Sequence, residues 1–202
     1  FFATFPWVHL VAPWNEANHY TQPTSRSPAA AARFANVAHR VCPRCTLVLA
    51  DILDSADSGT VTRRVPRYRN TLEWIRRYRR ALKVPRQVCG FHNYSDVNRF
   101  RTAGTRTLVP ALGCHQVWIT EAGGIYHLGA FLPSARRQAR ATRWMFHVAR
   151  SAPRITRLYV YTWFGAMTPG FDAGLVVRGH KRPAFTAFRS HIRPTATGAV
   201  AR

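Results

Sequence analysis

Two of the three glutamates in this 202-residue chain follow short apolar runs, an arrangement that could do acid–base chemistry. Val8 to Ala12 leads through Pro13, Trp14 and Asn15 to Glu16, and Val117 to Ile119 leads through Thr120 to Glu121. Apolar, β-branched and aromatic runs of this length are typical of strands. In a barrel of parallel strands, residues at the strand ends meet at one mouth. Two carboxylates that face each other there are what hydrolysis of a glycosidic bond requires.

The elements that must position these acids alternate between strand and helix patterns. We expect strands over residues 8–12, 47–50, 88–91, 117–119 and 158–162, and helices over residues 28–40, 66–82, 134–149 and 183–190. Residues 98–112 have an irregular or briefly helical pattern, and Ser27 is the expected cap of the first helix. Such alternation predicts an α/β fold with a parallel sheet. We expect one domain over residues 1–192 and a frayed tail over residues 193–202.

Composition limits the possible classes of function. A hydrophobic share of 47% can support a sizeable core, so the chain is not a disordered polyelectrolyte despite a net charge of +22. That charge would favour polyanions, but the arginines are spread along the expected outer helices instead of forming one stripe between aromatic side chains. The simplest interpretation is a compositional bias toward arginine. We therefore expect neither a nucleic-acid partner nor a membrane, and a basic nucleic-acid-binding protein is the weakest alternative.

Four cysteines bear on the compartment. Cys42 and Cys45 form a CPRC pair between an expected helix and an expected strand, an order that does not suit a thioredoxin-like site. A lone pair also lacks the second pair of a zinc knuckle. A local disulfide in an exported protein is the favoured interpretation, with inert thiols next. Cys89 and Cys114 are expected to be buried packing residues. We predict an extracellular location, although no signal peptide is visible in this chain.

At this point the sequence resembles the retaining barrel glycosidases of clan A, which include cellulase-like, mannanase-like and β-xylosidase-like enzymes. The resemblance rests on Asn15-Glu16 and Glu121, on His92-Asn93-Tyr94 between them, and on Trp163 after the last strand. It covers roughly residues 7–188. It implies a partial (β/α)8 barrel that runs from strand four to strand eight, with strands one to three absent. Ala17 stands where the clan commonly has a proline, a minor departure.

The resemblance also implies roles for individual residues. Glu16 matches the clan's general acid/base and Glu121 its nucleophile, and Tyr94 would hydrogen-bond the nucleophile. Five further residues are expected to contact the sugar. They are Trp14, Asn15, His92, Tyr126 and Trp163. The implied reaction is the hydrolysis of a β-linked oligo- or polysaccharide by double displacement, without a cofactor or a metal.

The front of the barrel is the larger departure, because only residues 1–6 precede the run that matches strand four. The chain is thus expected to be a fragment, a truncated gene model or one piece of a larger protein. The alternative function is a truncated, catalytically inactive barrel relic that still binds carbohydrate. Asp51, Asp54 and Asp172 also lie near strand ends, where loop and cap roles are expected. Glu73, the third glutamate, is expected to pair with Arg77 on the surface of a helix.

Overall fold

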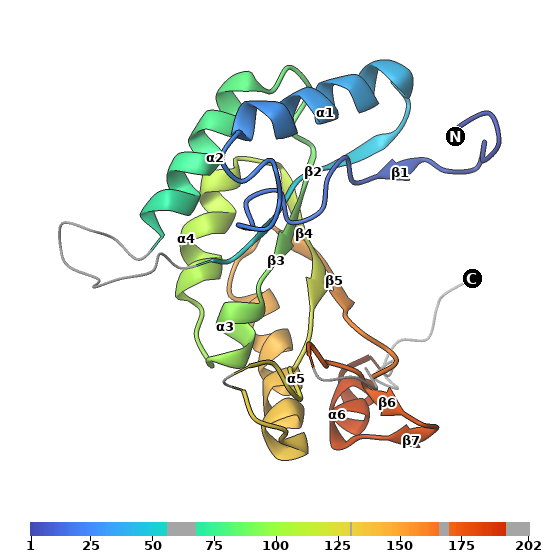
Figure 1. Ribbon diagram of the computed structural model, residues 1–202, viewed down its shortest axis with the longest axis vertical. Helices are drawn as coiled ribbons and strands as arrows, with labels where there is room; N and C mark the ends of the chain where they lie inside the picture. Colours follow the sequence, from blue (N-terminus) through green and yellow to red (C-terminus); the bar gives the residue numbers. More distant parts are fainter. Residues whose placement is uncertain (56–67, 130, 166–169, 193–202) are drawn as a thin grey trace, which may run out of the picture.

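The computed structural model describes residues 1–55, 68–129, 131–165 and 170–192. Its centre is a sheet of five parallel strands that lie in chain order. They are β1 (Leu10–Val11), β2 (Thr46–Leu53), β3 (Val88–His92), β4 (Gln116–Ala122) and β5 (Ile155–Val160). The helices are α1 (Pro28–Val41), α2 (Arg69–Ala81), α3 (Tyr94–Asn98), α4 (Ala103–Leu112), α5 (Ala135–Arg150) and α6 (Pro183–Ile192). A small antiparallel pair, β6 (Val176–Val177) and β7 (His180–Lys181), precedes α6 (Figure 1).

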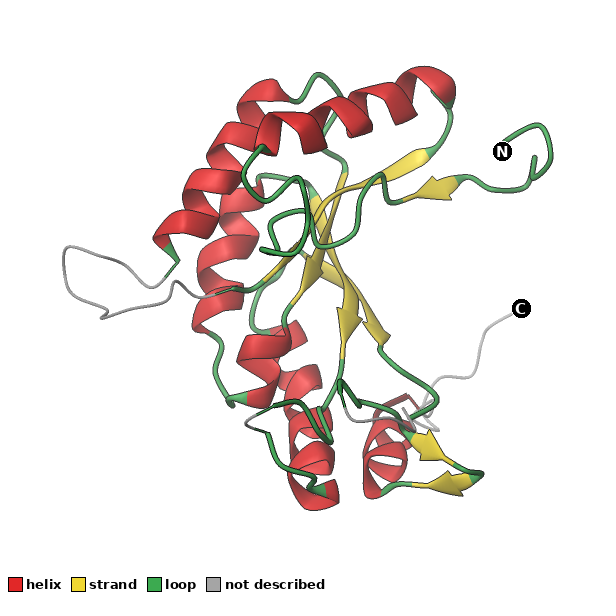
Figure 2. Ribbon diagram, in the orientation of Figure 1, coloured by secondary structure: helices red, strands yellow, loops and turns green. Residues whose placement is uncertain are grey.

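Helices α1, α2, α4 and α5 form one layer along one side of the strands, as Figure 2 shows. A parallel strand order with crossover helices on one side is the wall of a (β/α)8 barrel. This confirms the predicted α/β fold with a partial barrel. Among the described residues the sheet does not close, and β1 and β5 are its edges. No described helix combines the length and the apolar character that crossing a bilayer demands.

The core lies between the sheet and this helical layer. Leu49, Ile52 and Phe91 are fully buried under α1, α2 and α4, and Ile119 packs on Met145 of α5. Because side chains alternate across a strand, the neighbouring residues of β2, β3 and β4 point to the opposite, concave face. The second face has a small cluster of its own, formed by Val48, Val88 and Trp118. The polar residues at the strand ends are therefore held by strands packed on both faces.

The structure moves several expected boundaries. The strand expected over residues 8–12 is reduced to Leu10–Val11, because β1 is an edge that pairs only with β2. The stretch expected to be irregular contains two helices, α3 and α4. Ser27 does stand at the start of α1, but its side chain makes no capping hydrogen bond. The first residues of the helix expected over 66–82, and the tail over 193–202, lie outside the described residues.

The structure contains two disulfides, and one of them corrects a prediction. Cys42–Cys45 is the local bridge favoured from the sequence. Cys89 and Cys114 are buried as expected, but they are bonded to each other rather than packing as free thiols. The prediction missed this bridge because the two residues are 25 positions apart in sequence. Only the parallel pairing of β3 with β4 brings the beginnings of the two strands together.

The two bridges should differ in their contribution to stability. They close loops with sequence separations of 25 and 3 residues, and the chain entropy removed from the unfolded state grows with loop length. Replacing Cys89 and Cys114 together by Ala should lower the free energy of unfolding by about 3–4 kcal/mol, against about 2 kcal/mol for the Cys42/Cys45 pair. Urea titrations of both double variants measure the difference. A larger loss from the Cys42/Cys45 variant would contradict this order.

Candidate active site

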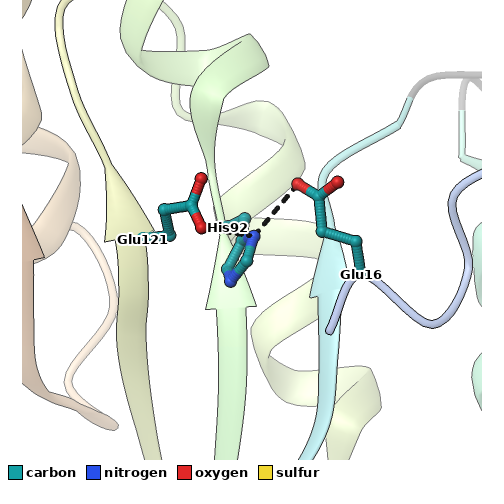
Figure 3. Close-up of side chains that lie close together, drawn as sticks. All are labelled: Glu16, His92 and Glu121. Carbon is teal, nitrogen blue, oxygen red and sulfur yellow. Dashed lines mark hydrogen bonds and ion pairs between the residues drawn. The ribbon is translucent and has the colours of Figure 1, made fainter. Parts of the chain in front are cut away.

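Acidic and imidazole side chains from four consecutive strand ends meet at the carboxyl edge of the sheet. Glu16 follows β1, Asp51 lies in β2, His92 ends β3 and Glu121 lies near the end of β4. In a parallel sheet all these ends lie on the same side. Figure 3 shows Glu16 and Glu121 on either side of His92. The structure thus brings the two predicted carboxylates together, although 105 positions separate them in sequence (121 − 16).

His92 stands between the two glutamates. Its Nδ1 lies 3.1 Å from Glu16 Oε1 and 3.9 Å from Glu121 Oε2. One carboxylate oxygen of each glutamate and a ring nitrogen of His92 all lie within 4.8 Å of one another. The imidazole is 1% exposed, whereas the side chains of Glu16 and Glu121 are 21% and 23% exposed. The buried imidazole of His92 therefore lies beside two carboxylates that solvent or a ligand can still reach.

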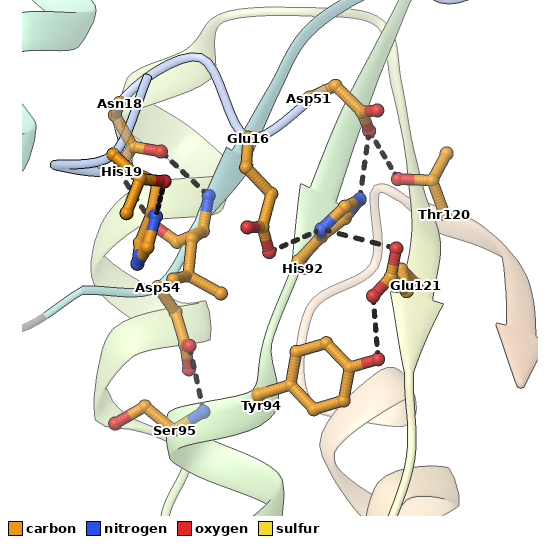
Figure 4. A network of polar contacts seen from close by, with 12 residues as sticks. Glu16, Asn18, His19, Asp51, Asp54, His92, Tyr94, Ser95, Thr120 and Glu121 are labelled. Atoms are coloured by element: carbon orange, nitrogen blue, oxygen red, sulfur yellow. Dashed lines mark hydrogen bonds and ion pairs between the residues drawn. The ribbon is translucent and has the colours of Figure 1, made fainter. Parts of the chain in front are cut away.

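Asp51 holds the other side of the imidazole, a role that the sequence did not reveal. Its Oδ1 lies 3.4 Å from His92 Nε2 and also accepts a hydrogen bond from the Thr120 hydroxyl (Figure 4). The sequence analysis gave Asp51 a loop or cap role, and the structure corrects it. The two other acids have structural roles. Asp54 accepts from the backbone N–H groups of residues 95 and 96 at the start of α3, whereas Asp172 accepts from the N–H of residue 174 in a loop and forms an ion pair with Arg182 at 2.7 Å.

Local irregularities in the strands aim these side chains. The pairing of β2 with β3 slips between Leu49 and Ile52, where Ala50 and Asp51 have φ values of 66° and 45°. Such a bulge inserts a residue and redirects the side chains beside it. Position 90 must be glycine here, because a Cβ would collide with the Asp51 carboxylate. A second slip, between β3 and β4, pairs His92 with Glu121.

The loop that carries Glu16 is tied to the end of β2. The Asn18 side chain donates to the carbonyl of Leu53 at 2.9 Å and accepts from its N–H at 2.8 Å. Glu16 itself has φ 47°, a left-handed conformation that is uncommon outside glycine and that surrounding contacts must maintain. Asn18 is thus a supporting residue that the sequence analysis did not single out. No local sequence pattern points to Asn18, because its partner Leu53 lies 35 positions away in β2.

Tyr94 meets Glu121 as the resemblance implied. Its hydroxyl donates to Glu121 Oε1 at 2.8 Å, and its ring rests edge-on against Phe171. Burial and the neighbouring Glu121 charge raise the pKa of Tyr94 well above its ordinary value, so the hydroxyl keeps its proton and remains a donor. The hydrogen bond fixes one oxygen of Glu121, and the other, Oε2, lies 3.9 Å from His92 Nδ1.

The charges in this cluster favour an imidazolium. Burial opposes protonation of His92, but the hydrogen bonds to Asp51 and Glu16 and the charge of Glu121 outweigh it and raise the pKa of His92 to about 9. The same hydrogen bond from His92 lowers the pKa of Glu16, against the opposing effect of burial. Glu16, His92 and Glu121 lie close enough to share a metal ion. However, both ring nitrogens face carboxylates, which favours the doubly protonated ring over the neutral ring that a metal needs.

The other residues predicted to contact the sugar form no hydrogen bond with Glu16, His92 or Glu121 among the described residues. Asn15 is exposed beside Glu16. The Trp14 ring lies tilted against Phe34 of α1, and Arg182 lies over the ring of Tyr126. Trp163, after β5, is 46% exposed with its edge against Phe185. Their contacts with sugar stay predictions.

The elevated pKa of His92 links stability to pH. An unfolded histidine titrates near pH 6.5. Protonation of His92 therefore contributes fully to stability below about pH 6.5, and the contribution is lost as the pH rises through 9. We expect the free energy of unfolding to fall by about 2–3 kcal/mol over this interval. Denaturant titrations across the pH range measure it. The His92→Gln variant should lose this slope, whereas replacing the exposed His9 by Gln should keep it; a slope unchanged in His92→Gln would refute the assignment.

Asp51 should be one source of that pKa. In Asp51→Asn the imidazolium loses a carboxylate acceptor, and the pKa of His92 should fall by about 1 unit or more. NMR titration of the His92 ring protons measures the shift directly. The Thr120→Val variant leaves the Asp51 carboxylate in place and serves as the control, with a smaller change expected. Equal values in wild type and Asp51→Asn would show that Asp51 only fills space.

The fold resembles solved structures of glycoside hydrolases, although the sequence matches no known family. No family model and no curated protein matches the chain. Solved structures do resemble it. An endo-β-1,3-glucanase of family GH128 from Pseudomonas viridiflava aligns over 90% of this chain and 68% of its own, with a TM-score of 0.60 and 20% identity. A GH39 β-xylosidase from Caulobacter crescentus aligns over 93% and 43%, with a TM-score of 0.58 and 15% identity.

A third resemblance, to xylanase 10B from Thermotoga maritima, covers 91% of this chain and 58% of that one, with a TM-score of 0.53 and 15% identity. These identities are low enough that the likeness concerns the fold alone. In each case nearly all of this chain matches only part of the solved barrel. The chain therefore has the fold of the clan A barrel glycoside hydrolases over part of their length, as the sequence resemblance implied.

Proposed function

We propose that this chain is the catalytic part of a retaining glycoside hydrolase that acts on a β-linked glycan. The observation that carries the proposal is the approach of Glu16 and Glu121, with one oxygen of each within 4.8 Å. Retaining glycosidases hold their carboxyl groups about 5–5.5 Å apart, whereas inverting enzymes need about 6.5–9.5 Å to admit a water molecule. The short separation supports direct attack by one carboxylate on the sugar.

Glu121 is the proposed nucleophile. One of its oxygens is held by Tyr94, and the other is free to bond to the anomeric carbon as the glycosidic C–O bond breaks. Glu16 would protonate the departing oxygen and then take a proton from the water that hydrolyses the ester. The His92 hydrogen bond lowers the pKa of Glu16, so in the free site the proton lies on the imidazole. We propose that His92 passes this proton to Glu16 before Glu16 protonates the departing oxygen, and that the proton later taken from water returns through Glu16 to His92.

The structural neighbours support the proposed class of substrate. Their names describe β-1,3-glucanases, a β-xylosidase and a xylanase, and one GH128 enzyme was captured with laminaritriose and laminaribiose. For this chain we propose a β-linked oligo- or polysaccharide. Asn15, exposed beside Glu16, is proposed to hydrogen-bond the sugar 2-hydroxyl, and Trp163 offers a half-exposed ring for stacking. Two disulfides favour a location outside the cell.

Replacing the nucleophile tests the assignment. In Glu121→Ala, hydrolysis of an aryl β-glucoside should fall by about 10⁴-fold or more because the covalent intermediate cannot form. Azide should restore turnover and give the α-glycosyl azide, the inverted product. Glu73→Ala, which removes the third glutamate at an exposed ion pair with Arg76 of α2, is the matched control and should leave the rate unchanged. Unchanged hydrolysis in Glu121→Ala would end the proposal.

The role of Glu16 has a separate signature. In Glu16→Ala, a poor leaving group such as methanol should depart orders of magnitude more slowly, while dinitrophenolate, which needs no proton, should leave at nearly the wild-type rate. The ratio of kcat/KM for the two substrates measures this difference. Equal losses on both substrates would argue against acid catalysis by Glu16. Oligosaccharide binding without turnover in the unsubstituted chain would instead favour the binding-only alternative.

A further inference from the structure

A cleft opens beside the candidate active site on the side of Tyr94. It has a volume of about 370 Å³, within the range of small-molecule sites. Its walls come from the end of β2, from α3 and the turn after it, and from the loop after β4. The residues that matter below are Leu53, Tyr94, Arg99, Arg101, Ile125 and Phe131. Because Tyr94 lines the cleft and also donates to Glu121, a sugar seated in the cleft would lie next to the sugar at the nucleophile.

The cleft combines an apolar floor with two cations. Leu53, Ile125 and Phe131 supply apolar surface, and such surface suits the flat face of a sugar ring. The side chains of Arg99 and Arg101 are exposed at the rim, and neither forms an ion pair with another described residue. The acid in the wall, Asp54, is fully buried and spends both oxygens on backbone N–H groups. The accessible charge of the cleft is therefore positive.

The two arginines are held at the rim by contacts of their own. The Arg99 guanidinium lies 5.3 Å from the centre of the Phe131 ring, and one of its nitrogens donates to the Ser95 hydroxyl at 3.3 Å. Both backbone polar groups of Arg101 are hydrogen-bonded. Its N–H donates to the carbonyl of Asp96, and its carbonyl accepts from the Trp144 indole. One anchored guanidinium group and a second on a fixed backbone, beside an apolar floor, suit a planar or tetrahedral oxoanion carried on a sugar.

We propose that this cleft is a subsite for an acidic sugar, one that carries a carboxylate or a sulfate, next to the bond that Glu121 attacks. This inference rests on the proposed function and adds the substrate class, an anionic β-glycan. It also gives part of the +22 net charge a local use. The sugar ring lies over Phe131 and Ile125, and its oxoanion accepts hydrogen bonds from Arg99 and Arg101.

Calorimetric binding to the whole chain tests the subsite, in the Glu121→Gln background to prevent turnover. The probes are a β-1,3-linked glucose trisaccharide, its form oxidised to the carboxylate at C6, and its 6-sulfated form, all at 150 mM salt. We expect one acidic form to bind about tenfold more tightly than the neutral one, the gain of a charge-assisted pair at a partly exposed site. The tighter of the two acidic forms identifies the oxoanion.

Variants separate this subsite from general attraction by a basic protein. Arg99→Gln together with Arg101→Gln should bring the affinity for the acidic probes down to that for the neutral one, and an unchanged circular dichroism spectrum shows that the variant is folded. The exposed Arg40→Gln on α1 is the matched control and should keep the preference. Equal affinity for neutral and acidic probes, or a preference that survives the double replacement, overturns the subsite but leaves the proposed hydrolysis standing. A chain that binds none of the three probes overturns both.

Discussion

The structure of this site depends on one buried imidazole surrounded by carboxylates. His92 contacts Glu16 on one nitrogen and Asp51 on the other, with Glu121 within 4 Å. Three anions at such distances would repel one another strongly in a poorly hydrated strand end. Protonation of the ring, with its pKa raised to about 9, relieves that repulsion and fixes the direction in which each acid points. The imidazolium thus stabilises the close approach of the two glutamates.

The sheet supplies this arrangement through its irregularities as much as through its regular pairing. Ideal strands would place residues at fixed, alternating positions, and Asp51 would not turn toward His92. The bulge at Ala50–Asp51 and the slip that sets His92 opposite Glu121 make this adjustment. Gly90 leaves room for it. Helices packed on the opposite side of the strands hold the distorted segments in place, so backbone strain near the site is sustained by core burial elsewhere.

The acids at the site and the arginines at the neighbouring cleft differ in whether they have a partner of opposite charge. Acids are rare in this chain, and those at the site have polar partners. Glu16 and Asp51 contact His92, and Glu121 accepts a hydrogen bond from Tyr94. The arginines at the neighbouring cleft form no ion pair with a described residue, because Asp54, the acid in the cleft wall, is buried and accepts from backbone N–H groups. An anionic ligand would complete that rim, as the imidazolium completes the centre. The carboxylates at the centre thus have a positively charged partner in His92, whereas the exposed guanidinium groups at the rim form no ion pair with a described residue.

The sequence alone determined the order of strands and helices and the two acids at strand ends, because hydrophobic periodicity and residue type are local signals. It also pointed to His92 and Tyr94 through a motif that spans three positions. Tertiary structure alone decided the role of Asp51, the anchor at Asn18 and the Cys89–Cys114 bridge. Each depends on residues far apart in the chain. Their contact is set by strand register and by bulges, which packing in three dimensions fixes and no local pattern encodes.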